Sequence, residues 1–318
     1  MPFSSKDSKM KYVFLIALVI VTAVGISILN TANYHGIEDN GANVGTLTIS
    51  ETEILGAGGL VSITNGGTLN ASFTTLQVST FPTTTAVFHL DGVDGQLTVT
   101  ESTLRGETGI QIDNSPGGGN FNFGTLSVIT NDGSAITGTA NNNQTITGTN
   151  CTLTTNRAAS IDLDNTNLNL MCDYIRNSST PEDNINLDAV TGTLISASTS
   201  TSATAAATGT GISISNSSIV TSFGITQANY GGTGDAVNLN NNTGNFSMTV
   251  ESTIGLRSSN GDALQAINHN AQINIINGGG GLLSVNGACI DIMNTVGNAT
   301  SINIEVETCT TTNTPNYG

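Results

Sequence analysis

The sequence predicts an all-β protein folded as a single-stranded parallel β-helix, or β-solenoid, of about 11–12 coils, preceded by an N-terminal hydrophobic signal or anchor helix. Three observations predict this architecture. Short runs of alternating apolar and polar residues recur along the chain. Clusters of Gly, Asn, Asp and Ser separate these runs, as expected of turns. Related motifs return at multiples of 50 residues, which is typical of a repeat protein.

The N-terminal segment 1–30 combines a basic start with an apolar run. All three Lys residues lie within the first eleven positions, and the uncharged run 12–29 follows them. The run is close to the length that spans a bilayer, and the pattern is typical of a secretory signal. Small residues at 23–25 offer a cleavage site, so residues 1–30 are either a removed signal peptide or a retained signal anchor. Both alternatives place everything after about residue 30 outside the cytoplasm.

The body of the chain repeats. GTLTISETEIL, GQLTVTESTLR and NFSMTVESTIG are copies of one motif, and they share a glutamate: Glu51, Glu101 and Glu251. A unit of 50 residues is too long for one hairpin and fits two coils of about 25 residues, in which equivalent positions stack about 4.8 Å apart. The repeated glutamates are therefore expected at a solvated turn, with Glu51 and Glu101 about 10 Å apart.

Period-two alternation marks the strands between these motifs. Examples are the runs 109–113, 160–164 and 211–215, and similar runs follow one another at short intervals along the whole repeat region. A pair of sandwiches and other β folds remain alternatives, but the repeat length favours stacked coils. We expect a linker or N-terminal cap at 31–44, the parallel β-helix at 45–310 and a C-terminal tail at 311–318.

The charge balance limits the class of partner. The 318 residues include 7 Lys and Arg against 23 Asp and Glu, which gives a formal net charge of −16. Beyond the N-terminal Lys residues the cations are Arg105, Arg157, Arg176 and Arg257. Four scattered cations cannot neutralise a row of phosphates, so a nucleic-acid partner is excluded. Scarce charge suits stacked coils, because like charges repel at the spacing of adjacent strands.

Two segments carry a family resemblance. GISISNSSI and GDAVNLNNNTGNFSMTV resemble the strand–turn–strand units of right-handed parallel β-helix, pectin-lyase-like proteins, in particular those of the bacterial surface and autotransporter-passenger type. The resemblance covers about residues 45–310 and is one of composition and repeat style. It implies a secreted or cell-surface, non-enzymatic protein that acts as an adhesin or as a structural or display rod. The alternative it implies is an extracellular polysaccharide-acting hydrolase or lyase.

The enzymatic alternative needs clustered carboxylates and a basic residue. A pectin-lyase-like site resembles a group of Asp residues with a nearby His and a cation for the uronate. Asp162 and Asp164 form a close pair with Arg157 a few residues before them, which makes them weak candidates. No catalytic residue is assigned, and the chain has no Trp to serve as a sugar-stacking platform.

The four cysteines fall into two pairs. Cys151 and Cys172 are separated by roughly one coil of sequence, and so are Cys289 and Cys309. Stacked Cα atoms about 4.8 Å apart are within the range that a disulfide accepts, and export implies an oxidising compartment. We predict both disulfides, with buried free thiols as the alternative. A metal site is not predicted, because no CxxC motif is present.

Two further sequence features bear on ligand binding. GGTGDAV, at 231–237, resembles a calcium-binding nonapeptide turn, but its Asp falls one place early and the motif occurs once, so a Gly-rich turn is favoured over calcium, and no other cofactor is expected. Outward Thr residues such as Thr48, Thr98 and Thr249 suggest a ladder. Thr-x-Thr pairs begin at Thr46, Thr98, Thr147, Thr152 and Thr208. Binding to ice or to a crystal surface is therefore a second alternative function. The partner itself, whether a cell-surface, glycan or protein ligand, is not encoded, and membrane contact is expected only through the N-terminal segment.

Overall fold

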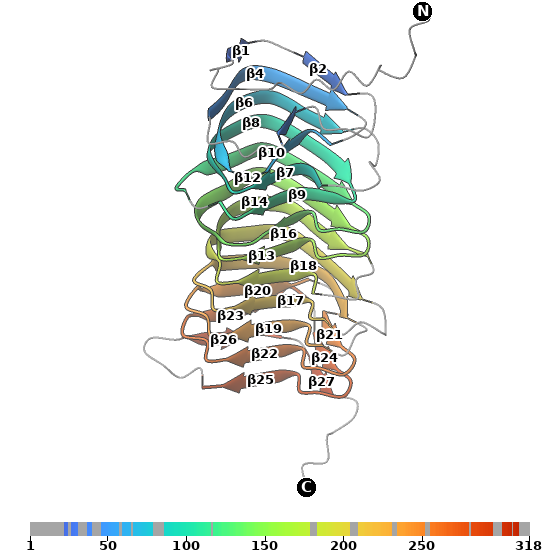
Figure 1. Cartoon of the computed structure of the whole chain (residues 1–318). Coiled ribbons are helices and arrows are strands. Elements are labelled where there is room, and N and C mark those ends of the chain that lie inside the picture. Colours follow the sequence, from blue (N-terminus) through green and yellow to red (C-terminus); the bar gives the residue numbers. More distant parts are fainter. Residues whose placement is uncertain are drawn as a thin grey trace, which may run out of the picture.

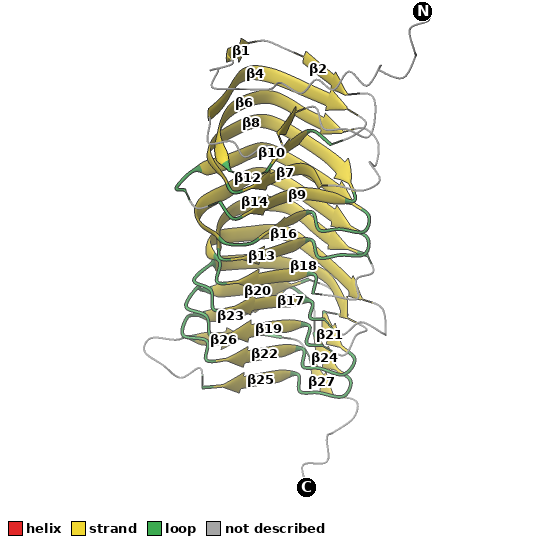
Figure 2. Cartoon of the chain, in the orientation of Figure 1, coloured by secondary structure: helices red, strands yellow, loops and turns green. Residues whose placement is uncertain are grey.

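The structure is a computed structural model of the whole chain. It describes residues 22–24, 27–30, 37–39, 46–56, 59–64, 66–78, 86–115, 117–178, 183–203, 209–230, 234–251, 255–279, 281–294, 301–306 and 308–311. These residues contain strands, turns and loops and no helix (Figure 2). Consequently, none of the described residues belongs to a helix that meets the length and hydropathy needed to cross a membrane.

The described chain winds into stacked coils whose strands all pair in parallel, from β1 and β2 at one end to β25 and β27 at the other (Figure 1). One sheet has 16 strands: β1 (Thr22–Val24), β2 (Ser27–Asn30), β4 (Thr46–Gly56), β6 (Gly67–Val78), β8 (Val93–Gly106), β10 (Asn120–Thr130), β12 (Asn141–Thr155), β14 (Thr166–Asn177), β16 (Thr191–Ala203), β18 (Val220–Tyr230), β20 (Phe246–Val250), β21 (Leu256–Ser258), β23 (Ile273–Asn277), β24 (Leu282–Ser284), β26 (Ile302–Ile304) and β27 (Cys309–Thr311). The other has 11: β3 (Ile37–Asp39), β5 (Val61–Ile63), β7 (Ala86–Asp91), β9 (Thr108–Asp113), β11 (Ile136–Gly138), β13 (Ile161–Asp164), β15 (Ile185–Asp188), β17 (Ile212–Ser215), β19 (Val237–Asn240), β22 (Leu264–Ile267) and β25 (Ile290–Met293).

Each coil has three sides, because the long strands of the larger sheet bend. The bend is clearest at β18, which pairs with β20 through 221–225 and with β21 through 228–230. Register shifts mark the same bend between β10 and β12. Gly124 lies there with a φ of 59°, and a Cβ atom at this position would overlap the carbonyl oxygens of Val99 and Thr100. The first halves of the long strands, together with β20, β23 and β26, form what we call the leading side. The second halves, together with β21, β24 and β27, form the trailing side. The 11-stranded sheet forms the short-strand side.

The stack consists of about eight full coils, flanked by shorter ones. Strands β4, β6, β8, β10, β12, β14, β16 and β18 have 11 to 15 residues each and cover two sides of their coils. Toward the C-terminal end the two sides are built from separate strands of 3 to 5 residues. The smaller sheet has 11 strands, one for each coil. The predicted 11–12 coils are therefore reached only when the shorter coils are counted together with the full ones.

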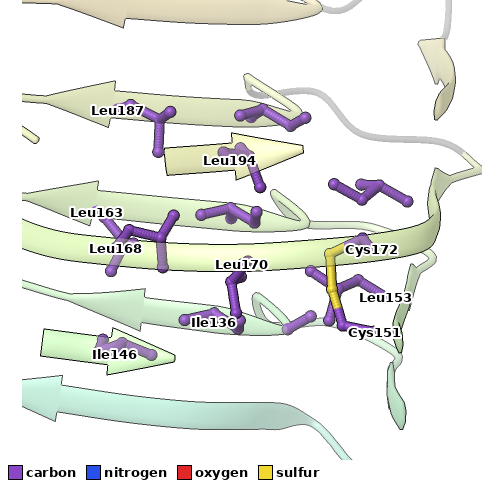
Figure 3. Close-up of a cluster of buried hydrophobic side chains, with 14 of the residues drawn as sticks. Ile136, Ile146, Cys151, Leu153, Leu163, Leu168, Leu170, Cys172, Leu187 and Leu194 are labelled. Atoms are coloured by element: carbon purple, nitrogen blue, oxygen red, sulfur yellow. A yellow bond between two sulfur atoms is a disulfide. The ribbon is translucent and has the colours of Figure 1, made fainter. Parts of the chain in front are cut away.

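Inward Ile, Leu, Val and Phe side chains form one continuous core. Ile110, Ile136, Ile161, Ile185 and Ile212 are successive register partners on the short-strand side, and each is buried. Such ladders arise because period-two alternation sends every second residue inward and parallel stacking aligns equivalent positions. Figure 3 shows the central part of this core, where leucines of the larger sheet meet those of the short-strand side.

A left-handed residue closes the turn after each short strand from β9 to β25. These residues, mostly Asn, have φ between 50° and 57°: Asn114, Ala140, Asn165, Ala189, Asn216, Asn241, Asn268 and Asn294. Asn tolerates this conformation better than most residues, which explains why six of these eight residues are Asn. Where it is described, the next residue points inward. Asn242, for example, accepts a hydrogen bond from the Ser217 N–H at 2.9 Å and donates one to the Ile214 carbonyl at 2.6 Å. Buried amides thus satisfy backbone groups where the chain changes direction.

The N-terminal helix is not confirmed. Most of the run 12–29 lies outside the described residues, but its end forms β1 and β2, which pair in parallel with β4. The β-structure therefore begins before residue 45, the predicted start of the β-helix. The reason is physical: the first long strand has an open edge, and an adjacent segment of β-branched residues can supply its hydrogen-bond partners. At the other end β27 reaches Thr311, and 312–318 lie outside the described residues.

Candidate functional surface

The short-strand side is acidic. Asp91 is in register with Asp113, and Asp164 with Asp188, at the ends of their strands. The nearby polar groups bind these carboxylates: Asn114 Nδ2 donates to Asp91 at 2.8 Å, and the Ser215 hydroxyl donates to Asp188 at 2.7 Å. The aspartates thus serve as acceptors that link one coil to the next.

A second set of aspartates caps the turns that lead into the short strands. Asp235 accepts a hydrogen bond from the Asp262 N–H at 2.8 Å, and Asp262 accepts one from the Ala288 N–H at 2.6 Å. Burial raises the pKa of Asp262; the Ala288 N–H opposes this, while the Asp235 and Asp291 carboxylates add to it. Asp235 belongs to the proposed calcium turn, of which 231–233 lie outside the described residues. Within the described ranges, no group of three or more His, Cys, Asp or Glu residues is placed to hold a metal ion.

The weak enzymatic candidates have separate partners. Arg157 Nη1 lies 3.0 Å from Asp132 Oδ1 on the preceding coil, and both side chains are largely exposed. Asp162 accepts a hydrogen bond from Asn186 Nδ2 at 2.9 Å. Asp164 points outward from the end of β13 and is exposed. The arginine is thus paired with Asp132 rather than directed at the two aspartates.

The three repeated glutamates occupy different places. Thr75 is in register with Glu53 on one side and with Glu101 on the other, so Glu53 rather than Glu51 shares a column with Glu101. Glu101 is exposed within β8 rather than at a turn, and Glu251 directly follows β20. The side chain of Glu51 lies outside the described residues. Sequence copies and structural register differ because two coils here are two residues shorter than the motif spacing: Thr48 shares a column with Gln96, not with its motif equivalent Thr98.

The leading side carries two outward columns without charge. The first column begins on β4 and takes one residue from each successive long strand: Thr48, Asn70, Gln96, Asn120, Thr145, Asn167 and Thr191. The second column begins on β6 in the same way: Ser72, Thr98, Asn122, Thr147, Asn169, Thr193 and Val220. We call the two columns together the Thr/Asn face. All of its side chains are partly or fully exposed.

Asn and Thr alternate from coil to coil on this face. β10 and β14 present Asn-x-Asn, whereas β12 and β16 present Thr-x-Thr. The Thr147 hydroxyl donates to Asn120 Oδ1 at 3.2 Å, and Asn167 Nδ2 donates to the Thr145 hydroxyl at 3.0 Å. The predicted Thr ladder is therefore a mixed ladder, in which each amide or hydroxyl is both a donor and an acceptor.

Exposed apolar side chains adjoin the polar columns. Met171 and Ile195 are register partners on β14 and β16, in the outward position next to the second column. They are 57% and 38% exposed, and Val220, which ends that column, is 44% exposed. The alternation of the sequence contains the signal for this face, since NFNF and NLNL place Asn outward between buried apolar residues. Which strands would be neighbours was not evident from the sequence.

Charged side chains return on the trailing side. Glu101, Arg105, Asp173 and Arg176 are exposed there on β8 and β14. The three sides of the rod therefore differ in charge: the short-strand side is acidic, the trailing side is mixed, and the Thr/Asn face is uncharged.

The cysteines pair across neighbouring coils as predicted from their spacing. Cys151 and Cys172 are register partners with Cα atoms 4.1 Å apart, and both are buried in the core, as Figure 3 shows. Cys289, just before β25, and Cys309, on β27, lie at the C-terminal end of the stack with Cα atoms 5.9 Å apart. Two pairs at disulfide distance are typical of a protein in an oxidising environment.

His269 should make the fold sensitive to acid. It is 1% exposed, directly after Asn268, in the place that Asn242 has one coil earlier. Neither ring nitrogen makes a hydrogen bond of ordinary geometry to the described residues. Burial lowers the pKa of His269 from 6.5, opposed by the Gln272 backbone. The contribution of neutral His269 to the free energy of unfolding is therefore fully present above the pKa that this residue has in the unfolded chain. It is lost as the pH falls below about 6.5, by at most about 1.4 kcal/mol per pH unit.

Urea titrations at pH 7.5 and 5.5 test this expectation. His269→Asn, which imitates Asn242, should lose less stability than the wild type over this interval. His35 and His89 remain in both proteins and give a common background. Equal losses for the two proteins would show that His269 is not the group that responds.

Comparison with known proteins gives no relative for this chain: no family model, no curated protein and no solved structure matches it.

Proposed function

We propose that this chain is an exported, non-enzymatic β-solenoid that acts as an adhesin or structural rod and makes its contacts through the Thr/Asn face. The observation that carries the proposal is the pair of aligned columns, seven coils long, without a charged residue. A regular surface of hydroxyls and amides suits an extended, uncharged partner. A charged partner would lose hydration there without gaining a counter-charge.

The rest of the molecule is consistent with this role. Stacked coils give a long surface whose stability comes from contacts between neighbouring coils. The cysteine pairs suit an oxidising, extracellular environment. The acidic short-strand side raises solubility and repels other anionic surfaces, which leaves the uncharged face as the side open to close contact.

Attachment of cells that display the full chain tests the proposal. Thr98→Glu places a charge in the second column, and we expect roughly tenfold fewer cells retained on glass or on other displaying cells, because an unpaired charge would be buried. Asn240→Glu, on the exposed end of β19, is the matched control and should leave attachment unchanged. Attachment by the wild type should also persist at high salt, since charge pairs do not carry it.

Other results would contradict the proposal. Equal attachment by the Thr98→Glu and wild-type chains would remove the Thr/Asn face from the mechanism. Cleavage of polygalacturonate by the purified chain, abolished in Asp162→Asn, would establish the enzymatic alternative instead.

A further inference from the structure

The leading side has exposed apolar groups that its own chain does not cover. Of the six large hydrophobic residues that are exposed in the described chain, Met171, Ile195, Val220 and Ile276 point outward on this side. The first three lie on consecutive long strands: Met171 and Ile195 beside the second column, and Val220 at its end. Water contact with such a group is unfavourable, and clustered groups of this kind mark interaction surfaces.

The distribution of charge selects the partner. With a formal net charge of −16, two copies of this chain repel each other at most approaches. The short-strand side would oppose aspartates to aspartates, as at Asp164 and Asp188. The trailing side carries charges of both signs, whereas the Thr/Asn face, together with Met171 and Ile195, carries none, so two copies can meet there without placing like charges opposite each other.

The chemistry of the face is also complementary to itself. Thr hydroxyls and Asn amides both donate and accept, so two such ladders can pair in any register that the backbones allow. Met171 and Ile195 beside the second column, and Val220 at its end, can cover their counterparts across a two-fold axis, as in an isologous interface. Seven coils about 4.8 Å apart and five residues of about 3.3 Å give a face of about 30 by 17 Å, at the lower end of what a specific interface needs.

We infer that the Thr/Asn face, which ends in Val220, and the adjoining Met171 and Ile195 form a self-association surface, through which a second copy of this chain packs face to face. This inference rests on the proposed function and identifies the partner as a second copy of this chain. Given the modest area, the expected affinity is in the micromolar range.

Sedimentation velocity of the full chain in a non-ionic detergent tests the inference. The wild type should shift from monomer to dimer as its concentration rises. Met171→Glu should weaken association at least tenfold, and Ile195→Ser should weaken it less. Asn240→Glu adds the same charge on the short-strand side and should associate as the wild type does. Far-UV circular dichroism and thermal unfolding confirm that each variant is folded.

A monomer at all concentrations, or equal association by Met171→Glu and the wild type, would overturn the inference. Mixing displaying cells with bare cells separates this failure from failure of the proposed function. If displaying cells attach to bare cells or glass while the purified chain stays monomeric, the adhesive role stands and the partner is not a second copy. If the Thr98→Glu cells also attach normally, both proposals fail.

Discussion

Replacement of Phe123 with alanine should lower the free energy of unfolding by about 4 kcal/mol. Phe123 is fully buried on β10, and its ring packs edge-on against Phe88 of β7 with centroids 5.1 Å apart and planes at 86°. The change removes the transfer free energy of a large side chain and leaves a cavity between two sides of a coil. It also removes the aromatic pair. Urea denaturation followed by far-UV circular dichroism measures the loss.

Two further variants calibrate the Phe123 result. Phe123→Leu keeps most of the volume and should cost about 1 kcal/mol. Thr98→Ala, outward on the neighbouring β8, should change stability by less than about 0.5 kcal/mol. If the stability of Phe123→Ala were within about 1 kcal/mol of the wild type, the ring would not lie in the core, and the assignment of inward residues along β10 would be mistaken.

Removal of the Cys151–Cys172 pair should cost about 3 kcal/mol. The two cysteines are 21 residues apart, and loss of this cross-link lets the unfolded chain sample many more conformations. Cys151→Ala/Cys172→Ala tests it without introducing a buried polar group. The unfolding midpoint of the double variant is compared with that of the oxidised and the reduced wild type, and the reduced wild type should resemble the variant.

The second cysteine pair is a close control, because its members are 20 residues apart. Cys289→Ala/Cys309→Ala should leave the central coils unchanged and increase hydrogen exchange mainly in β24, β25 and β27. Coils stabilise only their neighbours, so the loss of a terminal cross-link acts locally. Equal effects of both double variants on the central coils would show that the solenoid unfolds as a single unit.

Sequence alone was sufficient for the kind of fold and for the cysteine pairs. Alternation identifies the inward residues directly, as in Ile161 and Leu163, and the separation of Cys151 from Cys172 equals about one coil. Turn chemistry was also visible, because Asn recurs at the ends of most short strands from β9 to β25. These features are local or nearly so, and physical rules relate them to structure without knowledge of the whole chain.

Register could not be read from the sequence in the same way. Glu51 and Glu101 occupy matching places in two motif copies, yet Thr75 links Glu101 to Glu53. The difference is already present at Thr48, which shares a column with Gln96 rather than with Thr98, so it arises from the length of the coils, and that length depends on packing in the neighbouring coils. The Thr/Asn face escaped prediction for the same reason: Asn122 and Thr147 become neighbours only when register is known.

Parallel pairing throughout the rod also determines how it would bear a load. Hydrogen bonds between coils, such as that from the Asn216 N–H to the Asn240 carbonyl, run along the rod axis. A force along this axis breaks the hydrogen bonds of one coil at a time, whereas a force across the axis must break many hydrogen bonds between coils at once. Where Cys151 is bonded to Cys172, two layers are joined covalently, so tearing stops there. The force needed to unfold the rod should therefore depend on the direction in which it is pulled.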